Sequence, residues 1–246
     1  MLSSGSLIRA LGAGESAMLF TPKHVPLNWY KYDAQFSIEL LREYISGVER
    51  HIVEAIEVFH REKETHVFEE SAEEGYARIV EMHRDLDDET WDLEGIFEGY
   101  FPDLQRRSAL ITLYSFLEHE LEELCGLFIR DENLKVSLND MRGTGIERAL
   151  LFLEKIVGLQ IDKGTATWQE VKNIQKVRNL VVHNDAKLKD RSGNPKADVI
   201  KYVEGSVYLS GDEEINILDG YLLHVLETFD RQFQEIDKLV VARAST

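Results

Sequence analysis

The clearest structural signal in the chain lies at residues 110–128, which read LITLYSFLEHELEELCGLF. Apolar residues recur there at steps of three and four positions, the spacing that places side chains on one face of a helix. They are Leu110, Leu113, Leu117, Leu121, Leu124 and Phe128. Glutamates occupy the other faces, so the stretch predicts a long helix with one side in a protein core.

Four further segments repeat this helical spacing. One runs from Ile38 to Phe59, and a shorter one over residues 146–157 follows Gly143-Thr-Gly145. A third carries Val171, Ile174, Val177 and Val181, with Thr167 and Glu170 as a capping-box pattern at its start. The last covers residues 218–239.

Two segments are less regular. Residues 69–101 are very acidic, and we expect them to be helical and to end at Pro102, with these buried positions: Tyr76, Ile79, Val80, Trp91, Ile96 and Phe97. Residues 199–218 contain VIKYV, GSVYLS and EINIL, which are separated by glycines and predict two or three short strands.

These elements predict an all-α fold. It is an antiparallel bundle of four to six helices with a small β-hairpin inserted before the C-terminal helix. We expect one domain over residues 34–246, preceded by an N-terminal extension over residues 1–33 that contains Pro22, Pro26 and a Gly/Ser-rich start.

Composition narrows the class of protein. The 246 residues include 28 basic and 45 acidic ones, a net charge of −17, which argues against non-specific coating of nucleic acid or of an anionic membrane. Cys125 is the single cysteine, so a disulfide framework is not expected. Without a signal peptide or a membrane-spanning run, the sequence predicts a soluble, cytoplasmic protein with no membrane partner.

The usual metal and phosphate motifs are incomplete. His119-Glu120 lacks the second histidine of a metalloprotease helix, and the acidic cluster at residues 85–89 lacks calcium-loop spacing. Gly143-Thr-Gly145 lacks the Lys-Ser/Thr of a P-loop and is better explained as a helix start. We therefore expect neither a metal ion nor a cofactor.

Residues 177–188, VRNLVVHNDAKL, carry the candidate catalytic residues Arg178, Asn179 and His183 in a mostly apolar helix. A histidine can move a proton near neutral pH, an arginine can hold a phosphate, and an asparagine can orient either. These groups suit metal-free cleavage of an RNA phosphodiester. Asn179 and His183 share a helix face, whereas Arg178 and His183 diverge by about 140°. Either the helix breaks near His183, or a second copy of the motif completes the site.

The charge around this motif is reversed relative to the whole chain. Residues 162–201 contain nine basic and five acidic residues, a net charge of +4. The candidate substrate-binding residues among them are Lys172, Lys176, Lys187 and Lys189. A structural explanation of the motif is the alternative. Arg178 would pair with a carboxylate, such as that of Asp185, and His183 would lie near the negative end of the helix.

The motif resembles that of HEPN-domain proteins, in which an Arg and a polar residue precede a His near the end of a late bundle helix. VRNLVVHND matches it, and ITLYSFLEHELEELC is similar to an earlier core helix of the family. The resemblance spans approximately residues 34–243, although its only specific motif is short. One branch has a tyrosine two residues after the histidine; Asp185 stands there in this chain, which argues against that branch.

The resemblance implies a homodimer whose Arg/His motifs face each other, and a metal-independent endoribonuclease that cleaves single-stranded RNA. His183 would transfer the proton, Arg178 would hold the phosphate, and Asn179 would position them. The setting it implies is toxin–antitoxin function, phage defence or RNA processing, with an antitoxin or defence partner. The family also has non-cutting members, so the alternative is a non-catalytic module that dimerises and binds a nucleotide or partner.

Overall fold

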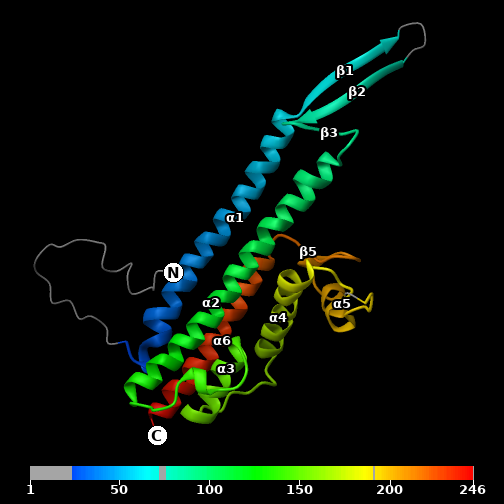
Figure 1. Cartoon of the computed structure of the whole chain (residues 1–246). Helices are drawn as coiled ribbons and strands as arrows, with labels where there is room; N and C mark the ends of the chain where they lie inside the picture. Colours follow the sequence, from blue (N-terminus) through cyan, green and yellow to red (C-terminus); the bar gives the residue numbers. More distant parts are fainter. Residues whose placement is uncertain (1–23, 72–75, 191, 246) are drawn as a thin grey trace, which may run out of the picture.

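The computed structural model describes residues 24–71, 76–190 and 192–245, and their architecture is a helical bundle (Figure 1). Its helices are α1 (Gln35–Glu62), α2 (Phe101–Asp131), α3 (Gly145–Phe152), α4 (Ala166–Asn184), α5 (Ala197–Glu204) and α6 (Tyr221–Ala244). Helix α2 packs against α1, α3, α4 and α6. The expected all-α bundle, with a short hairpin before the last helix, is confirmed.

The core forms along the predicted stripe of α2. All six of its apolar positions from Leu110 to Phe128 are buried, and the stripes of the other long helices meet them. Removing such a side chain from water contributes about 1.5–3 kcal/mol to stability. No helix in the described part of the chain is both long and apolar enough to cross a membrane.

The acidic segment differs from its predicted helix. Strands β1 (Glu64–Ser71) and β2 (Tyr76–His83) form an antiparallel hairpin that projects beyond the bundle (Figure 1), and the two-residue β3 (Leu86–Asp87) pairs with β2. Tyr76, Ile79 and Val80 match helical spacing by chance: of the predicted buried positions, Val80 is buried and Ile79 is exposed, while the Tyr76 side chain lies outside the described ones. β-branched residues such as Thr65 and Val67 favour the extended backbone instead.

Helical structure returns before Pro102, which does not end a helix. The π-helical turn η5 (Gly95–Tyr100) leads directly into α2, so Pro102, the second residue of α2, lies within a continuous helical run just after the π-helical turn. Trp91, expected to be buried, is exposed, whereas Phe97 packs on Phe59. The acidic segment is therefore a hairpin followed by a helical turn.

The predicted strands before α6 are only partly strands. VIKYV belongs to α5, whose inner face carries the buried Val199 and Val203. The hairpin consists of β4 (Leu209–Ser210) and β5 (Asn216–Ile217). Four residues in VIKYV have a high strand preference and favoured a strand, but burial at positions four apart selects the helix.

The described part of the predicted extension contributes to the core. Residues 24–34 contain the turns η3 (Pro26–Asn28) and η4 (Tyr30–Ala34), and the fully buried Trp29 between them packs edge-on against Phe233 at 5.3 Å. Residues 1–23 lie outside the described residues. Two other short elements, η6 (Leu138–Asp140) and η7 (Leu153–Val157), flank α3.

The start of α4 is capped by a different threonine from the one expected. The Thr165 hydroxyl accepts a hydrogen bond from the Trp168 backbone N–H at 3.1 Å, whereas the Thr167 hydroxyl donates to Glu235 at 2.7 Å. The capping box at Thr167 was therefore wrong by two residues.

Thr165→Ala is expected to lower the free energy of unfolding by about 1 kcal/mol, because it removes the N-cap acceptor. Thr165→Ser keeps that acceptor and should retain most of the stability. Urea denaturation followed by circular dichroism measures both. Equal losses in the two variants would contradict the capping role.

Glu120 on α2 is a buried carboxyl that should weaken the fold at high pH. Burial, with a contribution from the charge of Asp33, raises the pKa of Glu120 from 4.5 to about 7. As pH rises, the carboxyl of Glu120 loses its proton at a lower pH in the unfolded chain than in the native state. Between the unfolded and the folded pKa the native state therefore binds more protons, and the free energy of unfolding falls as pH rises. Glu120→Gln should therefore be more stable than wild type at pH 8, by roughly 3 kcal/mol, and equal to it near pH 4. Thermal unfolding across pH 4–8 tests this, and a difference independent of pH would refute it.

Candidate functional site

Helix α4 separates its residues into an inner and an outer face. Trp168, Val171, Ile174, Val177 and Leu180 are buried in the bundle, and Val181 is half-buried, which agrees with the predicted stripe. Asn179 and His183 consequently lie on the exposed side, as their four-residue spacing requires.

The helix ends one residue after His183, at Asn184. Asp185 and Ala186 both have left-handed backbone conformations, with φ of 53° and 58°, and the Ala186 N–H closes the end by donating to the Leu180 carbonyl. The Asn184 side-chain amide donates to the carbonyls of Lys187 and Lys189 at 2.7 and 2.8 Å. The chain is thus folded back against the end of α4.

A hollow of about 370 Å³ lies between this end of α4 and the start of α5. Helix α4 contributes Lys176, Asn179, His183 and Asn184 to its wall. The α5 side contributes Lys196, Asp198 and Val199. An imidazole, two amides, two ammonium groups and a carboxylate therefore line one small space. Lys196 was visible in sequence only as one of nine local basic residues, because its position depends on how α5 packs.

Arg178 lies away from this hollow, against α2. Its guanidinium is 5.1 Å from the centre of the Tyr114 ring, and its Nη1 donates to the Asn179 side-chain oxygen at 3.1 Å. Burial raises the pKa of Glu118, and the nearby charge of Arg178 opposes that rise. No described residue accepts a hydrogen bond from the buried Nε of Arg178. Asp185 pairs with Lys187 at 3.4 Å.

The predicted substrate-binding lysines are dispersed. Lys172 pairs with Glu147 on α3 at 2.7 Å, and Lys176 pairs with Asp198 at 2.9 Å and thereby lowers the pKa of that carboxyl. Lys187 and Lys189 are exposed on the loop after α4 and do not line the hollow. Nearby carboxylates therefore offset part of the local positive charge, and the positive groups at the hollow itself are Lys176 and Lys196.

A polar cluster joins α5 to α4 and α6 next to the site. The Glu170 carboxylate accepts one hydrogen bond from the Tyr202 hydroxyl at 2.5 Å and lies 2.7 Å from Nε2 of His224. Burial by itself would raise the pKa of Glu170, but hydrogen bonds from His224, Tyr202 and Asn173 outweigh it and lower the pKa below its ordinary value. The cluster positions α5, which supplies one wall of the hollow.

Glu170→Gln should destabilise the protein at pH 7 and reduce its sensitivity to acid. A carboxyl with a lowered folded-state pKa contributes stability above its unfolded pKa and loses that contribution as pH falls through the folded value. The wild type should therefore lose stability below about pH 4.5 more steeply than the variant does. Chemical denaturation at pH 7, 5 and 3 tests this; parallel curves would refute it.

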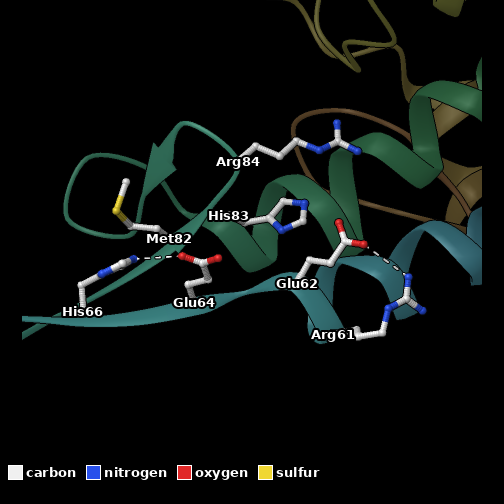
Figure 2. A pocket seen from close by; sticks show the side chains of 7 residues that line it. All are labelled: Arg61, Glu62, Glu64, His66, Met82, His83 and Arg84. Carbon is white, nitrogen blue, oxygen red and sulfur yellow. Dashed lines mark hydrogen bonds and ion pairs between the residues drawn. The ribbon is translucent and has the colours of Figure 1, made fainter.

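A second hollow, of about 540 Å³, lies at the base of the long hairpin (Figure 2). Its walls include Arg61, Glu62, Glu64, His66 and His83. Arg61 contacts Glu62 at 3.4 Å and His66 contacts Glu64 at 3.2 Å, so opposite charges offset one another there. The His83 ring lies edge-on against both Phe59 and Phe97, which are stacked on each other, and this contact anchors the hairpin to the bundle. This arrangement favours a structural role.

Within the described ranges, no group of three or more His, Cys, Asp or Glu side chains is arranged to hold a metal ion. The hollow at the end of α4 is the candidate site, and its polar lining consists of a histidine, two asparagines, two lysines and an aspartate. No protein-family model, curated protein or solved structure matches this chain. The residues of this hollow and the Arg/His motif therefore carry the functional proposal.

Proposed function

We propose that this protein is a metal-independent endoribonuclease of HEPN type that cleaves single-stranded RNA as a homodimer. The observation that carries the proposal is the hollow at the end of α4, where His183 and Asn179 share one wall with Lys176 and face Lys196. A toxin–antitoxin or phage-defence setting, with a corresponding protein partner, is proposed from the resemblance alone.

The proposed reaction needs only proton transfer and stabilisation of negative charge. The RNA 2′-hydroxyl attacks the adjacent phosphorus, His183 accepts its proton, and the bond from phosphorus to the 5′ oxygen breaks. The departing 5′ oxygen takes up a proton, which leaves a 2′,3′-cyclic phosphate and a 5′-hydroxyl. Cations at the phosphoryl oxygens stabilise the transition state, a role suited to Arg178 and Lys196.

Dimerisation would bring the arginine to the histidine. Arg178 and His183 of one chain point in directions about 140° apart, and Val182, which lies between them on the helix surface, is an exposed apolar residue. A second copy docked over Val182 would bury it and carry its own Arg178 toward the first copy's His183. Such a two-fold seam creates two identical composite sites.

A non-catalytic binding module is the alternative. The observation that favours it is the position of Arg178, which is held by Tyr114 and Asn179 instead of lining the hollow. In that case Arg178 would join α4 to α2, and its replacement would alter the stability or the oligomeric state of a chain that does not cleave RNA.

RNA cleavage by the purified chain separates these functions. Wild type should cut a labelled single-stranded RNA in the presence of EDTA and leave cyclic-phosphate ends. Arg178→Ala and His183→Ala should each lower the rate by at least about a hundredfold, the usual contribution of proton transfer by a positioned side chain. His119→Ala is a matched control, since His119 is an exposed histidine on α2. Absence of cleavage by a folded wild-type dimer on all RNAs tried would favour the binding module.

Mixing the two inactive variants tests whether the site is shared between copies. Half of the randomly assorted dimers would be mixed, and each of these would contain one intact pair of Arg178 and His183, so activity should recover to about a quarter of wild type. Thermal unfolding of each variant controls for stability. If both variants fold and dimerise but their mixture stays inactive, the site is not composite.

A further inference from the structure

The outward face of α1 carries a stripe of exposed residues that the bundle does not use. The buried residues Ile38, Ile45, Ile52 and Phe59 recur every seven positions and define the inner face. On the outer side, steps of three and four positions connect exposed residues, the spacing of a helix that packs against another helix. They are Phe36, Glu39, Glu43, Ser46, Arg50 and Val53.

The stripe is complementary to itself in the antiparallel direction. If a second α1 lies across the first with the two-fold axis between positions 44 and 45, Phe36 faces Val53 of the other copy and Glu39 faces its Arg50. The same relation places Glu43 opposite Ser46. Each contact occurs twice, so the pairing contains two apolar contacts between Phe36 and Val53 and two ion pairs between Glu39 and Arg50.

The exposure of these residues leaves them available for such a contact. Phe36 and Val53 are 62% and 56% exposed, so the bundle covers neither side chain. Glu39 approaches Arg42 only at 4.0 Å, and Arg50 has no ion pair with any described residue. Next to Ser46, Gly47 has no side chain, and nothing beyond its chain neighbours and its own helix backbone lies within 4 Å of the place where it would carry a Cβ. No other part of the bundle therefore covers the helix at this point.

We propose that α1 is a docking face for a second copy of this chain, packed antiparallel about positions 44 and 45. The occupant is a second copy because both the apolar ends and the central charges of the stripe find their complements in the stripe itself. A single helix pair buries less than the roughly 1,200–2,000 Å² of a standard stable interface, so this contact is weak and forms at high local concentration.

This seam is separate from the one proposed for RNA cleavage. Helices α1 and α4 lie on different sides of α2 (Figure 1), and both pack against α2. Two independent two-fold seams on one chain would join dimers into tetramers or longer assemblies. Failure of the α1 contact would leave the α4 proposal intact, and the reverse also holds.

Charge reversal tests the pairing by sedimentation velocity of the full-length chain over roughly 5–300 µM. Glu39→Arg and Arg50→Glu should each weaken association by about tenfold, because each replaces two attractive contacts by two repulsive ones in the symmetric pair. The double variant restores opposite charges and should return association to near the wild-type value. Asp212→Arg makes the same charge change as Glu39→Arg, but in an exposed loop, and should leave association unchanged.

Disulfide cross-linking tests the register. Glu43→Cys and Ser46→Cys variants, mixed and oxidised, should form a cross-linked heterodimer, since the only native cysteine, Cys125, is buried. Asp212→Cys mixed with either variant should not. The proposal is overturned if Glu39→Arg and Arg50→Glu leave association unchanged, if the double charge variant fails to recover association, or if the cross-link forms no faster than in the Asp212 control.

Discussion

Burial of the leucine-rich face of α2 is the interaction on which the rest of the structure depends. Helices α1, α3, α4 and α6 all pack against α2, and the side chains from Leu110 to Phe128 lie at the centre of the core. Because α4 must turn Val171, Ile174 and Val177 toward this core, its opposite side is exposed. The direction of Asn179 and His183 therefore follows from packing as well as from the local sequence. The hollow at the end of α4 is completed only where α5 is held against α4 and α6 by Glu170, Tyr202 and His224.

The helical bundle was predictable because its helices are long and each buries one continuous stripe. Ile38 to Phe59 on α1 and Leu110 to Phe128 on α2 repeat the helical period over several turns, and chance matches to such a pattern are rare. The sharing of one face by Asn179 and His183 followed from the same period. Local spacing was sufficient for these features because it determines which side chains of one helix lie together.

The features that could not be predicted depend on contacts between distant segments. Tyr76, Ile79 and Val80 fit a helix and a strand equally well over so short a range, and pairing with residues 66–71 of β1 selects the strand. In VIKYV, burial of Val199 and Val203 in the bundle selects the helix. Lys196 reaches the hollow because α5 packs beside α4, and Arg178 turns to Tyr114 because α2 offers an aromatic ring there. None of these partners is near in sequence.

The environment of Arg178 links the structural and catalytic explanations of the motif. The guanidinium of Arg178 lies over the Tyr114 ring and donates one hydrogen bond to the Asn179 side chain. Its buried Nε has no acceptor among the described residues. A buried donor without a hydrogen bond costs about 1–3 kcal/mol. The buried Nε atoms of Arg107 and Arg148 also have no hydrogen-bond acceptor among the described residues, so this feature of Arg178 fits a structural role as well as a catalytic one. The bond from Arg178 to Asn179 connects the arginine to the hollow, because Asn179 lines it. Under the catalytic proposal the guanidinium would have to leave the Tyr114 ring to reach a phosphate, and that movement would also free the Asn179 amide.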